Sequence, residues 1–172
     1  MNIRLATLTD IPKIMLLIKE VVPIMRESGN LQWDDTYPNP AVFENDIALG
    51  QLWVAEVNSH IAGVSAITTE QYPEYAEVGL DINEVAVVTH RLAVSPRFRG
   101  QGIAAALMLQ AEEVARQLQI DVLRVDTNTQ NLATQKLFPK MGYEFKGEMN
   151  LKFRPGLKFV CFEKRLPTQN IS

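Results

Sequence analysis

Apolar and polar positions change their spacing several times along the chain, and each change predicts a new element. Residues 2–6 alternate between apolar and polar, which is typical of a short strand. From residue 11 to about residue 27 the apolar residues recur every three or four positions, which predicts an amphipathic helix. We expect Thr9 or Asp10 to cap this helix, and Pro12 to lie in its first turn.

Strand-like runs dominate the middle of the chain. Asn58 and Ser59 separate two apolar runs, which predicts an antiparallel hairpin of residues 51–57 and 60–69. Residues 84–94 are rich in β-branched side chains and precede a helical pattern and a further apolar run, so we expect a strand–helix–strand unit with parallel strands. The helix of this unit should bury a stripe formed by Ile103, Leu107, Ala111, Val114, Ala115 and Leu118. The other predicted elements are a helix over 40–49, a strand over 121–127, a short helix from about 131, and strands over roughly 143–149 and 158–166.

These elements predict an α+β fold with a mixed, mostly antiparallel sheet flanked by helices. Residues 70–83 show no clear period and should form a loop. No internal repeat or linker interrupts the pattern, so we expect a single domain over residues 1–172.

Composition and charge narrow the classes of function. The formal net charge of −3 leaves no broad basic face, so neither nucleic acid nor a membrane surface is an expected partner. No apolar run is long enough to span a membrane, and the first residues lack the pattern of a signal peptide. Cys161 is the single cysteine, which favours a reducing cytoplasm. One cysteine and two histidines are too few for a standard structural zinc site, so no metal is expected.

The most informative segment is RLAVSPRFRGQGIAAALM, residues 91–108. The first backbone N–H groups of a helix lack internal partners, and with the helix dipole they attract an anion. Gly100 and Gly102 would let a phosphate approach the backbone, and Arg97 and Arg99 add positive charge. Because residues 85–111 contain no Asp or Glu, the segment predicts a site for an anion the size of pyrophosphate.

This segment also allows other interpretations. Gly100, Gly102 and Ala105 match the dinucleotide fingerprint G-x-G-x-x-A, with Asp121 about twenty residues further on. However, residues 95–99 separate the first glycine from its strand, and the upstream half predicts a hairpin instead of repeated βα units. The Walker pattern fails because no Gly-Lys-Ser/Thr follows. The plainest alternative is a helix start with turn glycines and solvated arginines.

The same segment resembles the signature Q/R-x-x-G-x-G/A of the GNAT superfamily of acyl-CoA-dependent N-acyltransferases, because Arg97, Gly100 and Gly102 fill its fixed positions. The order of predicted elements over residues 2–166 also resembles that fold. A second family pattern, N-x-x-A-x-x-x-Y-x-x-x-G-F, is recognisable but altered, at Asn131, Thr134, Phe138, Gly142 and Tyr143. The resemblance implies the GNAT fold, with acetyl-CoA or another acyl-CoA as cofactor.

The resemblance also implies where the cofactor would bind. The backbone of Leu92, Ala93 and Val94 would bond the pantetheine arm, and Asn131 would contact the cofactor near Phe138. In the family the sheet splays between this strand and the next parallel one, and the acyl group enters the gap. The residues implied for the pyrophosphate are Arg97, Arg99, Gly100, Gln101, Gly102, Ile103 and Ala104.

The implied reaction is direct attack of an amine on the thioester, for which a base must first deprotonate the ammonium. We expect His90 to be this base, because residues 90, 92 and 94 share one face of a strand and an imidazole accepts a proton near neutral pH. Its position resembles that of a histidine in the arylalkylamine acetyltransferases. The N–H of Val94 would stabilise the oxyanion. Glu84 and Glu77, acting through a water, are alternative bases.

The departing thiolate lacks its usual proton donor, since the family tyrosine is replaced by Phe138. Tyr143, Tyr75 or water would donate instead, or the thiolate would leave unassisted. Cys161 lies in the apolar run FVCFE without an obvious base, so we expect a core thiol and not a nucleophile.

The acceptor site is predicted from two irregular segments that commonly flank it in this fold. Trp33, Tyr37, Tyr72 and Tyr75 lie there and would form an aromatic wall for an amine, or simply pack in the core. Asp126, near the end of the parallel strand, would hold the substrate ammonium or serve the structure.

These expectations favour a cytoplasmic N-acetyltransferase that acts on a primary amine. No extended charged docking face shows in the sequence, so we expect a small-molecule acceptor. The resemblance also allows a homodimer. The alternatives are a non-catalytic acyl-CoA-binding or sensing module, which Phe138 would explain, and a dinucleotide oxidoreductase.

Overall fold

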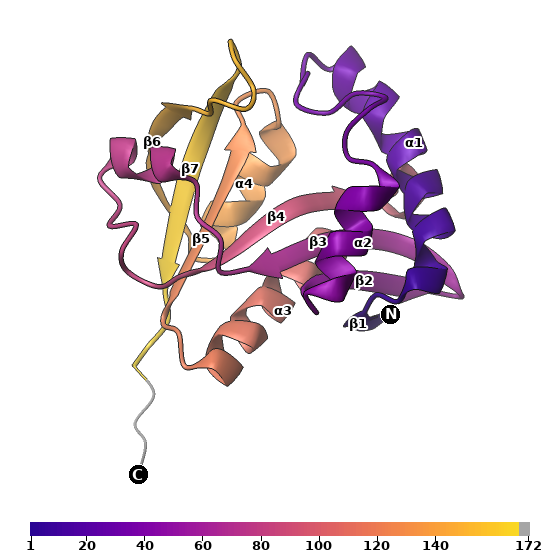
Figure 1. The fold of residues 1–172 in the computed structure, drawn as a ribbon, viewed down its shortest axis with the longest axis horizontal. Coiled ribbons are helices and arrows are strands. Elements are labelled where there is room, and N and C mark those ends of the chain that lie inside the picture. The colour runs from indigo at the N-terminus through magenta and orange to yellow at the C-terminus, as the bar shows by residue number, and fades with distance from the viewer. Residues whose placement is uncertain (169–172) are drawn as a thin grey trace. The chain divides into compact units, whose positions relative to one another are not determined.

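The computed structural model describes residues 1–168, which divide into two compact units. The first unit comprises Met1–Ile67 and His90–Gln110, and within the described chain the second comprises Thr68–Thr89 and residues 111–168. Seven strands are hydrogen-bonded in the order β1-β2-β3-β4-β5-β7-β6, and one of their pairings is parallel (Figure 1). The predicted α+β fold with a mixed, mostly antiparallel sheet is therefore confirmed. The single domain over residues 1–172 stays a prediction.

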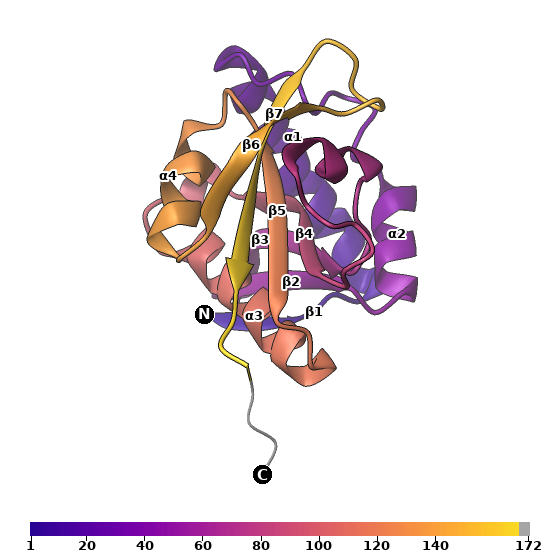
Figure 2. The ribbon, with the colours of Figure 1, turned by 90° about the vertical axis from the view of Figure 1, so that its left-hand side faces the viewer.

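The second unit is built on strands from the C-terminal half of the chain. Strand β5 (Val122–Asn128) pairs antiparallel with β7 (Lys158–Arg165), which pairs with β6 (Glu144–Asn150). Helix α4 (Leu132–Lys140) lies against β6 (Figure 2). The first residues of β4 (Val87–Val94) join β5 through a parallel ladder that runs from Val87↔Leu123 to Thr89↔Val125.

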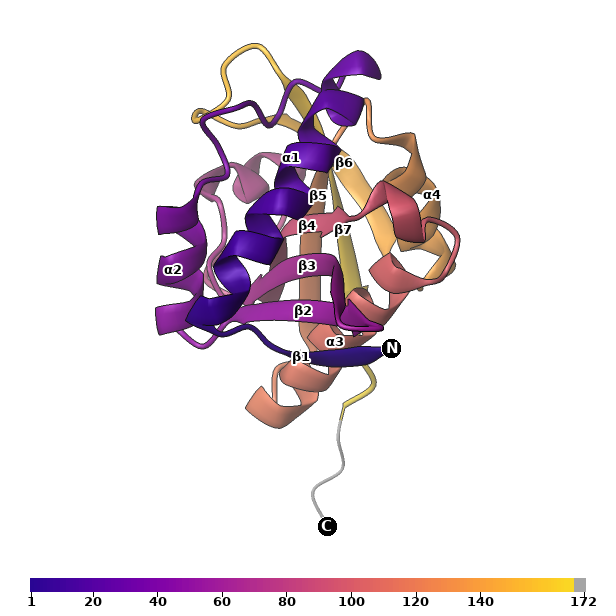
Figure 3. The same cartoon turned by 90° about the vertical axis from the view of Figure 1, so that its right-hand side faces the viewer.

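The first unit is an antiparallel sheet covered by helices. Strands β1 (Asn2–Leu5), β2 (Leu52–Val57) and β3 (His60–Thr68) form it, and Figure 3 shows α1 (Ile11–Glu27) and α2 (Pro40–Ala48) against it. Asn58 and Ser59 take positive φ values of 48° and 67° between β2 and β3, as tight hairpin turns require. The predicted hairpin is confirmed, and it excludes the repeated βα units of a dinucleotide fold. The core under α1 and α2 includes Ile14, Leu17, Ile18, Phe43, Leu52, Val54 and Val64.

A glycine positions the start of α3 (Ile103–Leu118) on this sheet. Ile103 and Leu107 pack with Ala62 in a second cluster of the first unit. A Cβ atom at Gly63 of β3 would lie 2.6 Å from Cγ2 of Ile103. Only glycine therefore allows the first turn of α3 to approach β3 this closely.

Four local expectations were wrong. The strand predicted from residue 84 begins at Val87, and the predicted loop over 70–83 contains a 3-10 helix, Pro73–Val78. Leu118, expected in the core stripe of α3, is 55% exposed because it is the last helical residue and the chain turns at Gln119, whose φ is 56°. Asp10 precedes α1 but makes no capping hydrogen bond to it; its carboxylate accepts the N–H of Thr7 at 2.7 Å instead.

Candidate functional site

The glycine-containing loop of the first unit leads from β4 into α3. Ser95 is buried and fixes the end of β4, because its N–H donates to the carbonyl oxygen of Ala62 at 2.8 Å. Gly100 and Gly102 both have a φ of 76°, in the left-handed region that favours glycine. A Cβ atom at either position would meet no atom within 4 Å, so the backbone conformation, and not crowding, requires glycine. The loop is open at both positions.

Backbone N–H donors accumulate at this loop. The first helical hydrogen bond of α3 runs from the N–H of Ala106 to the carbonyl oxygen of Gly102 at 3.0 Å, which leaves Ile103 and Ala104 without helical acceptors. In the described chain, the exposed residues 99–102 also have no backbone acceptor for their N–H groups, Gln101 included. Consecutive donors at the positive end of a helix dipole suit an anion with several oxygens. These residues fit a pyrophosphate.

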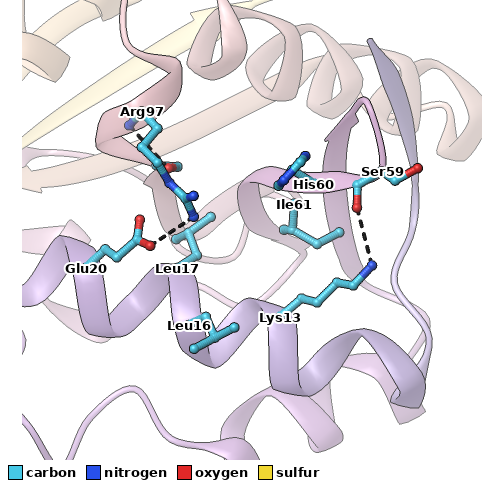
Figure 4. Close-up of a pocket in the computed structure, with 9 residues that line it drawn as sticks. Lys13, Leu16, Leu17, Glu20, Ser59, His60, Ile61 and Arg97 are labelled. Carbon is cyan, nitrogen blue, oxygen red and sulfur yellow. Dashed lines mark hydrogen bonds and ion pairs between the residues drawn. The ribbon is translucent and has the colours of Figure 1, made fainter.

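The two arginines of the loop differ in their surroundings. Figure 4 shows Arg97 directed at Glu20 of α1, with Nη2 and Oε1 2.9 Å apart. Arg97 lines a cavity of about 410 Å³ together with Lys13, Leu16, Leu17, Glu20, Ser59, His60, Ile61 and Ser95. Arg99 is exposed and forms no ion pair within the described residues. Arg99 is therefore the loop arginine whose charge is not already compensated.

The end of β4 has alternating faces but one irregular residue. Leu92 and Val94 pack in the cluster that includes Ile103, whereas Ala93 is buried in the cluster under α1 and α2. Arg91 has a φ of 52°, so regular alternation is broken between His90 and Leu92. Alternation alone therefore does not place His90 on the face of Leu92 and Val94. His90 is buried, and its role as base stays a prediction.

An ion pair that no sequence pattern indicates lies beside this irregular residue. Asp46 of α2 accepts hydrogen bonds from Nε and Nη2 of Arg91 at 2.8 and 2.7 Å. Nη1 of Arg91 lies 3.5 Å from the hydroxyl of Tyr37, which brings this predicted acceptor residue beside β4. Trp33 is 4% exposed in the core of the same unit, which favours the packing role for its ring. Arg91 and Asp46 are 45 positions apart, so no local pattern pairs them.

Two predicted acceptor residues meet in the second unit. The hydroxyl of Tyr75 donates to Oδ1 of Asp126 at 2.6 Å. Burial and the nearby charge of Asp126 raise the pKa of Tyr75 well above its usual value. Tyr72 lies edge-on to Tyr75 and stacks on Phe153, with ring centroids 5.9 and 5.3 Å apart. The aromatic group beside Asp126 thus includes Phe153, which no sequence pattern indicated.

The altered family motif forms the start of α4 and its packing. The side chain of Asn131 caps α4 by accepting the N–H of Thr134 at 3.2 Å, and its amide N–H groups remain donors. Phe138 is 1% exposed, with Tyr143 5.9 Å away between ring centroids. Burial and the charge of Glu112 raise the pKa of Tyr143, and its hydroxyl has no hydrogen-bond partner in the described chain. Of the two alternative proton donors, Tyr143 alone is not already bonded to a carboxylate.

The contacts and exposure of the other candidate residues do not favour a catalytic role. Glu84 pairs with Arg124 and Arg165, and the hydrogen bond from Arg165 lowers its pKa. Glu77 is exposed. Cys161 is buried and burial raises its pKa to about 12, which agrees with a core thiol. Among residues 1–168, no group of side chains could hold a metal ion, and no helix is long and apolar enough to cross a membrane.

Comparisons with known proteins agree on one family. Residues 18–143 match the family model described as acetyltransferase (GNAT) family. The N-acetyltransferase YesJ of Bacillus subtilis is 27% identical over 146 residues, which cover 83% of this chain and 81% of that protein. The chain spans less than half the length of three rodent N-acetyltransferase 8 relatives.

Solved structures of acetyltransferases have the same fold as this chain. A GNAT acetyltransferase from Streptococcus agalactiae superposes with a TM-score of 0.81 at 29% identity, over 96% of this chain and 95% of that chain. The structure of yncA from Salmonella typhimurium with its cofactor acetyl-CoA superposes with a TM-score of 0.70 at 20% identity, over 100% and 97% of the two chains. At this identity, the likeness to yncA shows a shared fold and no more.

Proposed function

Because the chain belongs to the acetyltransferase (GNAT) family, we propose that it acetylates the primary amine of a small molecule by direct attack of the amine on the thioester. That the chain is an acetyl-CoA-dependent N-acetyltransferase follows from its family. The observation that carries the proposed cofactor site is the loop after β4. Its consecutive N–H donors, with Gly100 and Gly102 open to a ligand, fit the pyrophosphate of the cofactor.

The cofactor supplies the acetyl group as an activated thioester. In our proposal the N–H groups of residues 99–104 hold the pyrophosphate, with Arg99 contributing its charge. The amide of Asn131, which caps α4 through its oxygen only, donates to the cofactor beside Phe138. The backbone of residues 92–94 holds the pantetheine arm, since these residues lie beyond the last pair of the parallel ladder with β5.

The chain's own groups then move the proton and stabilise charge. His90 accepts a proton from the ammonium, which frees the lone pair that forms the new C–N bond as the C–S bond breaks, and the nitrogen then loses its second proton to solvent. The N–H of Val94 stabilises the negative charge that develops on the carbonyl oxygen. The thiolate is a fair leaving group, so it departs unassisted or takes a proton from Tyr143.

Asp126 is the group that we propose for holding the acceptor ammonium. Its carboxylate is half-buried, and the bond from Tyr75 fixes one of its oxygens. The rings of Tyr72 and Tyr75 beside it favour a cation over a neutral group. Tyr75→Phe should therefore raise KM for the amine several-fold and leave the Kd for acetyl-CoA unchanged. An unchanged KM for the amine would remove Asp126 from the acceptor site.

The cofactor site is tested by calorimetry with acetyl-CoA. Gly102→Glu places a carboxylate where we put the pyrophosphate and should abolish binding. Gly50→Glu is the matched control, because Gly50 also has a positive φ of 66° and open surroundings in the same unit. Equal effects of the two substitutions, or a wild type that does not bind, would refute the loop assignment.

The acceptor is identified by release of free thiol from acetyl-CoA against a panel of small primary amines, peptide N-termini and lysine side chains. We expect turnover with small amines. Turnover restricted to peptides would refute the proposed acceptor class.

We also propose a cytoplasmic location, which the single cysteine supports. Sedimentation would reveal whether the chain forms the homodimer that its family allows.

A further inference from the structure

The strand proposed to hold the cofactor contains one residue with left-handed geometry. Arg91 of β4 has a φ of 52°, which residues other than glycine, asparagine and aspartate rarely adopt. It lies two positions beyond Thr89, the last residue of β4 in the parallel ladder, and directly before Leu92. Such residues persist only where other contacts hold them, and they cluster at functional sites.

The contacts that hold Arg91 come from α2. Asp46 accepts two hydrogen bonds from the guanidinium, at 2.8 and 2.7 Å, in the bidentate arrangement that fixes both partners. The side chain of Asp46 is 1% exposed and that of Arg91 is 14% exposed, so solvent screens the pair little. Nε2 of Gln51 donates to Oδ1 of Asp46 at 3.0 Å and fixes the carboxylate in turn. The backbone of residue 91 is therefore anchored through its own side chain.

We propose that Asp46 and Arg91 are positioning residues, whose ion pair holds residue 91 in left-handed geometry and so directs the backbone groups of residues 92–94 at the cofactor. The inference rests on the proposed role of those backbone groups. One left-handed residue turns the peptides that follow it relative to a regular strand. Without the pair, residue 91 relaxes toward extended geometry, and the N–H of Val94 turns away from the thioester oxygen.

The test uses the conformational freedom of glycine. Asp46→Asn/Arg91→Ala and Asp46→Asn/Arg91→Gly both remove the ion pair without leaving a buried carboxylate unpaired. The two variants differ in whether residue 91 adopts a positive φ without strain. We expect the Kd for acetyl-CoA to rise about tenfold in the alanine variant, as for one or two misaligned hydrogen bonds, and by no more than about threefold in the glycine variant.

A role through charge, or through stability alone, gives glycine no advantage. Equal losses in the two variants, or a larger loss with glycine, would therefore overturn the proposal. Arg116→Ala removes an exposed arginine of α3 and is the control for the loss of an arginine. A wild type that does not bind acetyl-CoA refutes the proposed cofactor site and this inference together, whereas equal variants beside a wild type that binds refute the inference alone.

Hydrogen exchange keeps the proposal testable if the alanine variant does not fold. In Asp46→Asn we expect faster exchange in the peptide that covers residues 90–94, with β1 and β2 unchanged. Equal acceleration throughout the first unit would assign the pair to global stability and overturn the positioning role.

Discussion

Replacement of Gly63 by alanine should destabilise the protein although it adds a single methyl group. The new Cβ atom would lie 2.6 Å from Cγ2 of Ile103, 3.1 Å from Cδ1 of Leu107 and 3.2 Å from the carbonyl oxygen of Ala93. Carbon atoms in contact lie about 3.5 Å apart or more, so the first turn of α3 must move by about 1 Å. Ile103 is 2% exposed and Leu107 is fully buried, so neither side chain can move into solvent.

The expected cost follows from overpacking. Gly63 is not in the left-handed region, so the cost arises from contact and not from backbone strain. Extra methyl groups in a packed core typically cost about 1–3 kcal/mol, and each kcal/mol lowers the Tm of a chain of this size by about 2–4 °C. Urea unfolding measures the free energy directly. Because α3 begins at the proposed pyrophosphate site, the affinity for acetyl-CoA should fall as well.

A double-mutant cycle decides whether the contact with Ile103 is the cause. Leucine has no branch at Cβ, so Gly63→Ala/Ile103→Leu removes the closest clash. We expect the double variant to recover about 1 kcal/mol relative to the sum of the single changes. Gly50→Ala adds a methyl group where no atom lies within 4 Å but where φ is 66°, so it measures the cost of left-handed backbone strain without crowding. Strict additivity, or an unchanged stability of Gly63→Ala, would refute the reasoning.

Two further predictions concern charged groups. Arg124 is 1% exposed and donates to the buried Glu163 at 2.9 Å, so Arg124→Leu should cost about 3–5 kcal/mol in urea unfolding; a loss below about 1 kcal/mol would contradict this. The hydrogen bond from Arg4 lowers the pKa of Asp10 from 3.8 to about 2. A depressed pKa stabilises the fold above the unfolded value, so the stability advantage of wild type over Asp10→Asn should be complete above pH 4 and disappear as the pH falls toward 2. An advantage that persists unchanged at pH 2 would show that it does not come from the carboxylate.

The sequence predicted elements best where residues carry their own conformational preference. Asn58 and Ser59 tolerate positive φ, and the hairpin between β2 and β3 forms there. The strand start at residue 84 was wrong, because β-branched composition does not show whether a partner strand exists. Glu84 instead directs its carboxylate at Arg124 and Arg165. Such ion pairs depend on residues far along the chain, which no local window contains.

The candidate site also combines residues that the sequence predicts with contacts that no local pattern shows. Tyr75 and Asp126 were each predicted from the segment in which they lie, but their hydrogen bond joins residues 51 positions apart. Phe153 was missed because the segment between β6 and β7 has no periodic pattern, and only its stacking on Tyr72 brings it to the site. The carboxylate and the hydroxyl could therefore each be predicted from the sequence, but the hydrogen bond between them depends on the fold.

Positive φ shows most directly why the site could be predicted only in part. Gly100 and Arg91 both have left-handed geometry, with φ values of 76° and 52°. Glycine adopts this geometry by itself, so the loop could be predicted from the residue. Arginine disfavours it, so at residue 91 the local preference points to a regular strand, and we propose that the ion pair with Asp46 reverses that preference. On this proposal, a chain with glycine at 91 would no longer need a carboxylate at 46, whereas a chain with a residue other than glycine, asparagine or aspartate at 91 would need some contact in its place.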